Sequence, residues 1–248
     1  MDRSPPSRES PEQSESLFGP GVPKLVSCIV PAYNAERWLS EALGSVLDQT
    51  YRPVEAIVVD DGSTDRTFDI VASFGDRVVG LRQLNAGPAL ALNHGIRASR
   101  GEFLAFLDAD DLWPSGKLEL QVARLREAPE LAACYGLVQN FWVDGLKIEE
   151  ESLRGHRILE PIPGLVTGTL LARRSTFARV GLFEDRRHAY ALAWAMRLRD
   201  RDLPHEVIDE VLLRRRYHEG NMSRDGGPGS REQVLDLLKR SLDARRGG

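Results

Sequence analysis

The feature that most constrains the fold is a regular alternation of short apolar runs with helical segments. The apolar runs, which have the composition of buried strands, are residues 25–30, 54–59, 77–84 and 102–107. The segments between and after them, with helical spacing of apolar side chains, are residues 35–49, 65–74, 88–98 and 115–127. This order predicts an α/β fold with a mainly parallel central sheet and helices on both faces.

Polar side chains collect where these predicted strands end. They are Asn34, Asp60, Asp61, Asn85, Asp108 and Asp110. In open parallel sheets ligands bind just beyond the carboxyl ends of the strands. The pattern therefore predicts a ligand site at that edge of the sheet.

Beyond residue 130 the pattern is looser and indicates a mixture of short elements. We expect strands at 132–142, 167–173 and 210–217, a hairpin turn at Asp144-Gly145, and helices at 174–180 and 190–201. The expected organisation is a disordered tail at residues 1–22, a single domain at 23–224, and a linker with a C-terminal helix at 225–248. The apolar stripe of that helix packs on the domain or on a partner, such as a second copy of the chain.

Charge and composition exclude several classes of protein. The net charge of −4 argues against a nucleic-acid binder with a broad basic face, and the run Arg214-Arg215-Arg216 is expected to be a local solvated face or edge strand. No apolar run reaches the roughly 18–20 residues that cross a bilayer, and residues 1–15 lack a signal-peptide core. We expect a cytoplasmic protein whose Cys28 and Cys134 are reduced core residues.

The strongest chemical signal is Asp108-Ala109-Asp110, directly after the most apolar predicted strand. Two carboxylates at this spacing can reach one hard divalent cation, and Mg²⁺ or Mn²⁺ held there would neutralise a diphosphate leaving group. Alone, the motif also fits a loop with local turn bonding. The sequence contains neither GxGxxG after the first strand nor GxxxxGK[ST], so a Rossmann dinucleotide site and a P-loop are unsupported.

Two further segments suit a nucleotide. A carboxylate of the Asp60-Asp61 pair could accept the imide N–H of uracil, or bind another base or the ribose. Tyr33 could stack on a base, although an ordinary wall aromatic is the default for such a residue.

The motifs together resemble the ordered signature of family-2 glycosyltransferases. They are residues 30–34 (VPAYN), 59–65 (VDDGSTD), 85–87 (NAG) with 91–95 (ALNHG), 106–111 (FLDADD), 167–168 (TG), 173–174 (RR), 180–183 (VGLF) and 218–223 (HEGNMS). The resemblance spans residues 24–224 and implies a GT-A fold, a nucleotide-sugar donor and, usually, inversion at the anomeric carbon.

The resemblance also implies roles for individual residues. Tyr33 with Asp60 or Asp61 would hold the base, Asp108 the ribose or the metal, and Asp110 would be the direct metal ligand, with His218 near the metal and diphosphate. The nucleotide-binding set is Pro31, Tyr33, Asn34, Asp60, Asp61, Asn85, Gly87, Asn93, Asp108 and Ala109. The expected cofactor is Mn²⁺ or Mg²⁺, and the expected donor is a UDP- or GDP-sugar.

The chain departs from the family pattern at the acceptor side. Inverting transfer needs a base for the acceptor proton, and Tyr190-Ala191 stands where the family has its Glu-Asp pair. Glu184, Asp185 and His188 are candidate substitute bases. A second departure is Leu92, where many members have arginine.

The sequence thus predicts a metal-dependent hexosyltransferase-type glycosyltransferase with an unidentified acceptor. Three consequences of the missing Glu-Asp pair stay open. The protein has slow or no transfer activity, it uses a substitute base, or the acceptor or a partner subunit supplies the base. The alternatives are a catalytically impaired GT-A module that binds a nucleotide-sugar or serves as a partner scaffold, and a nucleotidyltransferase on a similar sheet, which the lack of a Gly-rich basic first loop disfavours.

Overall fold

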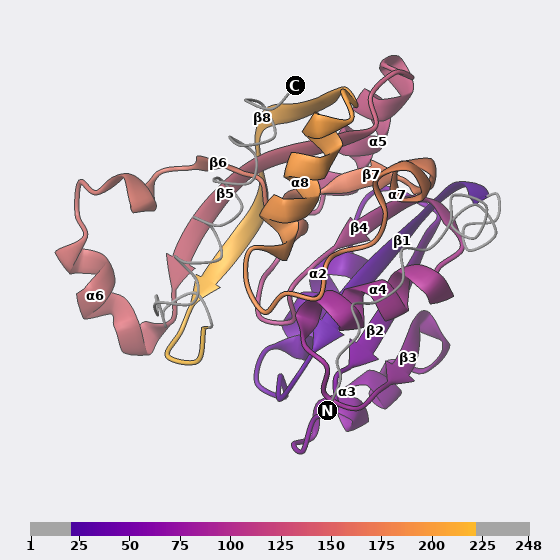
Figure 1. The fold of residues 1–248 in the computed structure, drawn as a ribbon. Coiled ribbons are helices and arrows are strands. Elements are labelled where there is room, and N and C mark those ends of the chain that lie inside the picture. The colour runs from indigo at the N-terminus through magenta and orange to yellow at the C-terminus, as the bar shows by residue number, and fades with distance from the viewer. Residues whose placement is uncertain (1–20, 222–248) are drawn as a thin grey trace, which may run out of the picture.

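The structure, a computed structural model, describes residues 21–221 (Figure 1). Most of the tail predicted for residues 1–22, and the linker and helix predicted for residues 225–248, lie outside this range. The first strand begins at Val22, whose N–H donates to the Arg100 carbonyl at 2.7 Å, so Val22 belongs to the sheet rather than to the predicted tail.

The first half of the described chain is the predicted alternation of strands and helices. Its elements are β1 (Val22–Ala32), α2 (Leu39–Leu47), β2 (Val54–Asp60), α3 (Thr67–Ser73), η1 (Gly75–Arg77), β3 (Val78–Arg82), α4 (Pro88–Ala98), β4 (Gly101–Phe106) and α5 (Lys117–Glu127). The four strands lie in the order β3-β2-β1-β4 and every neighbouring pair is parallel. Their carboxyl ends therefore share one edge of the sheet.

The second half extends the same sheet with mixed pairing. Its elements are β5 (Ala133–Trp142), η2 (Asp144–Leu146), α6 (Lys147–Ser152), η3 (Arg157–Leu159), β6 (Ile162–Gly164), η4 (Thr167–Thr169), β7 (Leu171–Arg173), α7 (Arg174–Val180), α8 (Tyr190–Asp200) and β8 (His205–Tyr217). β7 is antiparallel to β4 and β5, whereas β8 runs parallel to β5 and pairs with it as far as Tyr217. The mixed α/β fold matches the predicted GT-A class.

Two predictions for this half are wrong. Asp144 and Gly145 do not form a tight hairpin turn but lie in η2, the start of an arm that carries α6 away from the sheet (Figure 1). The chain returns to β5 only at β6, because η2, α6 and η3 intervene. The strand predicted at 167–173 is also shorter, since residues Thr167–Thr169 form a 3₁₀ turn before β7.

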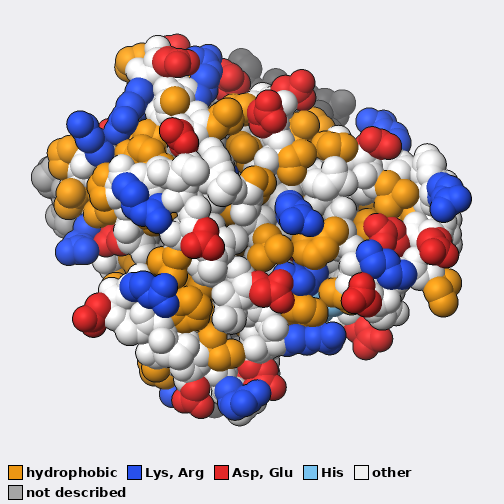
Figure 2. Space-filling model, turned by 180° about the vertical axis from the view of Figure 1, so that it is seen from behind, with side chains coloured by type: hydrophobic (Ala, Val, Ile, Leu, Met, Phe, Trp, Pro, Cys, Tyr) orange, Lys and Arg blue, Asp and Glu red, His pale blue; other side chains and the backbone are white. Residues whose placement is uncertain are grey.

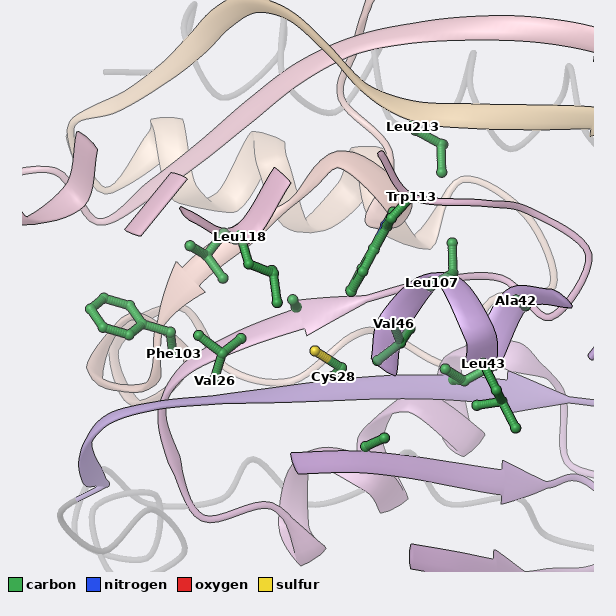
Figure 3. Packing of buried hydrophobic residues seen from close by; sticks show 14 of the residues in the cluster. Val26, Cys28, Ala42, Leu43, Val46, Phe103, Leu107, Trp113, Leu118 and Leu213 are labelled. Atoms are coloured by element: carbon green, nitrogen blue, oxygen red, sulfur yellow. The ribbon is translucent and has the colours of Figure 1, made fainter. Parts of the chain in front are cut away.

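The sheet is buried on both faces, as its apolar strands require. One cluster packs Val26 and Cys28 of β1 against α2, α3 and α5 (Figure 3). The other packs Ile29 of the same strand against α4, α7 and α8. Successive side chains of a strand point to opposite faces, so neighbouring residues of β1 belong to different clusters.

Both cysteines are free and fully buried, as predicted. Burial raises the pKa of the Cys28 and Cys134 thiols to about 12, so they are protonated core side chains rather than nucleophiles.

The surface carries charges of both signs. Figure 2 shows acidic, basic and apolar side chains interspersed over the face turned away from the viewer in Figure 1. Within residues 21–221, no helix has the length and apolar character needed to span a bilayer.

Lys117 is an unusual member of the core because this charged residue is only 1% exposed. Its Nζ donates to Gln121 Oε1 at 2.5 Å and lies 4.4 Å from the centre of the Trp113 ring. Burial lowers the pKa of Lys117 from 10.5 to about 7, with the nearby Cys134 and Cys28 opposing the shift.

We expect Lys117→Met to stabilise the protein at pH 6 and to flatten its dependence of stability on pH. The folded pKa of Lys117 lies below the unfolded value, so between pH 7 and 10.5 the unfolded chain binds more protons and stability rises with pH. Below pH 7 the cost of burying the charge is complete. Replacing the charged side chain with methionine should raise the free energy of unfolding by ~1–3 kcal/mol at pH 6. This range already allows for the loss of the hydrogen bond from Lys117 to Gln121.

Urea unfolding of both proteins between pH 6 and 9.5 measures this effect. The advantage of the variant should shrink as pH rises, whereas Lys147→Met, at an exposed lysine paired with Glu150, should leave the pH profile unchanged. Parallel curves for wild type and Lys117→Met would contradict the assignment.

Candidate functional site

The loops that follow β1 and β2 are tied together by reciprocal hydrogen bonds. The Asn34 N–H donates to Ser63 Oγ at 2.9 Å, and the Thr64 N–H donates to Asn34 Oδ1 at 2.9 Å. The N–H of the next residue, Ala35, donates to Thr67 Oγ1 at 2.8 Å. Asn34 adopts a left-handed conformation with φ of 47°, which asparagine tolerates better than most residues. Asn34 therefore shapes this part of the site through its main chain and its amide oxygen.

Tyr33 stands at the start of the first of these loops with 53% of its surface exposed. It follows Ala32, which is in register with Asp60 on β2. The ring is therefore exposed at the end of the sheet where β2 ends at Asp60, and its stacking on a base stays a prediction.

The two aspartates that end β2 have different environments. Asp61 Oδ1 accepts from Gln83 Nε2 at 2.7 Å and from the Ala86 N–H at 2.8 Å, while Oδ2 accepts from the Gly87 N–H at 2.8 Å. Both oxygens are occupied by the loop that leads into α4. Asp61 thus positions that loop, and the choice left open between the two aspartates for base binding favours Asp60.

Asp60 is completely buried and has few partners. Its Oδ1 accepts from the Ser63 N–H at 2.9 Å, and its Oδ2 lies 2.9 Å from Arg82 Nε. The remaining approach to this carboxylate is through Arg82.

The Asn85–Asn93 segment divides between site and core. Asn85 is exposed, and Gly87, with φ of 93°, is the N-cap of α4 ahead of Pro88. Asn93 is 3% exposed; its Nδ2 donates to the Phe183 carbonyl at 2.8 Å and its Oδ1 accepts the Phe183 N–H at 3.0 Å. Its amide joins α4 to the α7–α8 loop through these two bonds, and the predicted contact of Asn93 with a nucleotide stays a prediction. Leu92, the second departure from the family pattern, is fully buried in the core.

The carboxylates after β4 are brought against β8 by a short antiparallel bridge. Leu112 pairs with Arg214, and Asp111 Oδ1 accepts the Arg216 N–H at 2.8 Å. Asp110 Oδ2 then receives His218 Nε2 at 3.0 Å and Asn221 Nδ2 at 3.2 Å. Residues more than a hundred positions apart thereby meet at the carboxyl edge of the sheet, as predicted for Asp110 and His218.

Electrostatic repulsion within this group is strong. Burial and then the neighbouring Asp110 raise the pKa of Asp108 to about 6, and Arg215 opposes the shift. Burial, followed by Asp110 and Asp108, raises the pKa of Asp111 well above its usual range. Ala109 between them is buried. A divalent cation at this position would relieve the repulsion.

The residues present fit a metal that takes only part of its ligands from the protein. Within residues 21–221, no three His, Cys, Asp or Glu side chains form a cage. Asp110 Oδ2 and His218 Nε2 converge, leaving other positions for phosphate oxygens and water, which is how Mg²⁺ is usually held. The Gly220 N–H donates to His218 Nδ1 at 3.1 Å, so Nε2 carries the proton here. For Nε2 to ligate a metal, the proton of the neutral ring must be on Nδ1. Nδ1 could then no longer accept the Gly220 N–H, so that N–H would have to turn away.

Arg216 is a site residue that the sequence analysis missed. Of the two positions expected for the Arg214-Arg215-Arg216 run, the edge strand agrees with β8, which pairs with β5, but Arg216 itself is not solvated. It is 5% exposed, and its Nε donates to the Asp110 carbonyl while Nη2 bonds Glu41 of α2, both at 2.8 Å. Its guanidinium lies 4.3 Å from the centre of the Trp38 ring, which in turn faces His218. Period-two alternation on a strand that ends at Tyr217, directly before His218, was the available signal.

Arg215 lies on the other face of β8 and was also missed. Its neighbours Arg214 and Arg216 both contact the Phe141 ring, whereas Arg215 is half-buried and close enough to Asp108 to lower its pKa. It provides positive charge on the carboxylate side of the strand.

The first turn of α8 reaches the same carboxylates. Tyr190 bonds the side chain of Thr167, and burial followed by Asp108 raises the Tyr190 pKa beyond its ordinary value. A phenol held in this state cannot accept a proton at neutral pH. Ala191 follows it in the helix, where no side chain can do so.

The three candidate substitute bases lie on the loop before α8. Glu184 is paired with Arg186 at 2.7 Å and Arg197 at 3.7 Å, an arrangement that anchors the loop to α8. Asp185 is exposed and His188 half-buried. Of the two carboxylates, Asp185 is the one turned to solvent.

Comparison with known proteins agrees with the geometry. The model of glycosyl transferase family 2 matches residues 27–187. An uncharacterized glycosyltransferase of Rickettsia typhi is 34% identical over 209 residues, covering 79% of this chain and 64% of that protein. A UDP-Glc:α-D-GlcNAc-diphosphoundecaprenol β-1,3-glucosyltransferase of Escherichia coli is 35% identical over 141 residues, covering 55% of each.

Among solved structures, glucosyl-3-phosphoglycerate synthase from Mycobacterium tuberculosis in complex with Mn²⁺, UDP and glucosyl-3-phosphoglycerate has a TM-score of 0.62. It is 20% identical and the match covers 97% of this chain and 86% of that one, a likeness of fold. This chain spans less than two thirds of the length of the curated relatives it matches first.

Proposed function

Because the chain belongs to glycosyltransferase family 2, we propose that it transfers a sugar from a nucleotide-diphosphate donor to an acceptor hydroxyl at the carboxyl edge of its sheet. The observation that carries the proposal is the meeting of Asp110 with His218 and Asn221, next to the half-buried Asp108 and the buried Asp111. Such a concentration of carboxylate charge suits a cation bound to a diphosphate.

The donor would lie along the ends of the four parallel strands. Asp60 and the exposed ring of Tyr33 take the base, Asp108 takes the ribose, and Asp110 with His218 takes the metal. Asn34, Asn85, Gly87 and Ala109 belong to the surrounding loops and Pro31 to the end of β1, and all five supply shape rather than charge. Bound Mn²⁺ or Mg²⁺ would neutralise the diphosphate as the sugar departs.

Arg216 has a positioning role in this proposal. Its bond to the Asp110 carbonyl and its stacking on Trp38 fix the loop from which the Asp110 carboxylate projects. The ion pair with Glu41 also ties Arg216 to α2. Through Arg216, the loop that carries Asp110 is therefore held by both β8 and α2.

Inverting transfer also needs a proton acceptor on the far side of the sugar, and Ala191 provides none. Asp185 or His188 takes that role if the loop before α8 closes over the acceptor, and Glu184 only if it leaves Arg186 and Arg197. The second candidate function is a donor-binding module with little transfer activity. The specific observation in its favour is the Tyr190-Ala191 pair at the start of α8.

Donor binding and donor turnover separate the two functions. We expect UDP or GDP to bind in the presence of Mn²⁺, measured by calorimetry, and UDP- or GDP-sugars to release free nucleoside diphosphate when an acceptor is added. The acceptor panel should include a GlcNAc-diphospholipid and phosphoglycerate, the groups named for two similar proteins. Binding without turnover across the panel favours the second function, and no binding of either nucleotide with Mn²⁺ rejects both.

A further inference from the structure

Arg215 faces the carboxylates that follow β4 without being paired to any of them. Side chains alternate along β8, so Arg215 points away from the Phe141 ring, which both of its neighbours on the strand contact. Arg215 is half-buried, and in the part of the chain that the structure describes its guanidinium has no hydrogen bond and no ion pair. A guanidinium carries five N–H donors in a planar fork, so the donors of Arg215 are available to a ligand.

The position of Arg215 is on the acceptor side of the site. Burial raises the pKa of Asp108 and of Tyr190, and Arg215 opposes both shifts, so its guanidinium lies near the carboxylates and near the first turn of α8. That turn is where the usual base for the acceptor proton is missing. The proposed metal ligand His218 instead contacts Trp38 at the start of α2. Arg215 is therefore separated by the strand from the groups assigned to the metal and the diphosphate.

The same face of the sheet carries two buried polar atoms without a hydrogen bond. Asn140 of β5 is in register with Arg215. Trp142 is in register with Tyr217, and their rings stack with centres 4.7 Å apart. Among the described residues, neither Asn140 Oδ1 nor Trp142 Nε1 has a hydrogen-bond partner. Buried polar atoms nearly always have one, so this face has the unfilled polar groups that a polar ligand or water completes.

We propose that Arg215 binds a phosphate group of the acceptor, and that the acceptor is a phosphorylated compound. This assignment rests on the sugar transfer proposed above and names the class of its acceptor. The carboxylates Asp108, Asp110 and Asp111 repel an anion, so a phosphorylated acceptor needs a cation beside its phosphate, whereas a neutral acceptor does not. The planar fork of an arginine matches two oxygens of one phosphate.

Two other roles of Arg215 predict different behaviour. If Arg215 holds the diphosphate of the donor, it is already occupied when nucleotide and metal are bound, and its removal weakens the nucleotide. If Arg215 only offsets the repulsion among the carboxylates, it acts through its charge at a distance. The neighbouring Arg214, on the opposite face of β8, then has nearly the same effect.

The test measures the binding of inorganic phosphate to the full chain after Mn²⁺ and either UDP or GDP, whichever binds more tightly, have filled the donor site. Mn²⁺ is paramagnetic, so the relaxation rate of the phosphorus nucleus of phosphate reports binding close to the metal. We expect Arg215→Gln to weaken phosphate about tenfold or more and the nucleotide less than about threefold, because the charge-assisted contact is made to phosphate alone.

Arg214→Gln is the matched control, because it removes the same charge from an exposed side chain one residue away. The main-chain pairing of Arg214 with Leu112 does not depend on that side chain. Both affinities should stay at the wild-type value in this variant. In assays of transfer by wild type, inorganic phosphate should inhibit competitively against the acceptor and not against the nucleotide-sugar.

Contrary results separate the possibilities. No binding of phosphate to nucleotide-loaded wild type, or unchanged binding in Arg215→Gln, would overturn the role of Arg215 and leave donor binding intact. Equal losses in Arg215→Gln and Arg214→Gln, a loss of nucleotide affinity, or inhibition competitive with the nucleotide-sugar would overturn it as well. Failure of wild type to bind either nucleotide with Mn²⁺ would reject the proposed function itself. Thermal unfolding identifies misfolded variants, and Arg215→Lys, which keeps the charge, should retain part of the phosphate affinity.

Discussion

Asp110→Ala is expected to lower sugar transfer by about 10²–10⁴-fold and to weaken Mn²⁺-dependent binding of UDP. Asp110 Oδ2 is the point where His218 and Asn221 converge, so the substitution removes the central oxygen of the proposed metal site. A metal that neutralises a leaving diphosphate contributes several kcal/mol to the transition state, and each 1.36 kcal/mol is a factor of ten in rate.

The loss should be specific to the metal-dependent part of binding. We expect the residual affinity of Asp110→Ala for UDP to be the same with Mn²⁺ and with EDTA, whereas the wild-type affinity falls when EDTA is added. Asp209→Ala removes an exposed carboxylate of β8, the strand that leads to His218, and is the matched control. If Asp110→Ala keeps wild-type turnover and its response to Mn²⁺, the metal site lies elsewhere.

The fold could be predicted from sequence because its first half follows local rules. Runs such as Val54–Asp60 are too short for a buried helix and stop at aspartates, and α4 begins and ends at the predicted residues Pro88 and Ala98. In the second half, strand β6 has three residues, and β5 finds its long partner β8 more than sixty residues later. Local pattern carries no information about such pairings, which is why the Asp144-Gly145 turn was misinterpreted as a hairpin.

The site shows the same division. Asp110 and His218 were predicted as metal ligands, and the structure brings His218 Nε2 to 3.0 Å from Asp110 Oδ2, while the metal itself stays a prediction. Asp61 and Asn93 have the residue types of ligand-binding groups, but the folded backbone of Gly87 and of Phe183 uses their oxygens. Which polar group is left over for a ligand depends on hydrogen bonds that form only in the tertiary structure. Arg216 was missed for the converse reason, because an arginine run is usually solvated, and the Trp38 and Phe141 rings, the Asp110 carbonyl and Glu41 that make its burial favourable meet only in the tertiary structure.

Ala191→Asp should raise acceptor-dependent transfer by about 10²–10⁴-fold, the usual contribution of a general base. The first turn of α8 already lies close to the carboxylates that follow β4. Burial and then the charge of Asp108 raise the pKa of Tyr190, and Tyr190 forms a hydrogen bond with the Thr167 side chain. Ala191, next in the helix, is half-exposed, so a carboxylate there needs no room in the core. The helix N-terminus also favours a negative charge at this position.

Ala191→Asn is the control, because it has nearly the same shape as the aspartate variant but cannot accept a proton. Initial rates of sugar transfer at pH 6–9 should rise for Ala191→Asp alone, while the affinity for UDP stays at the wild-type value in both. Equal rates in the two variants would mean that the native reaction already has a base. Asp185→Asn and His188→Gln would then identify that base. The variant at the true base should transfer sugar about 10²–10⁴-fold more slowly than wild type, the usual contribution of a general base. A rise in transfer rate in Ala191→Asp alone, with unchanged affinity for UDP, would instead mean that the missing base at Tyr190-Ala191 limits transfer while donor binding is intact.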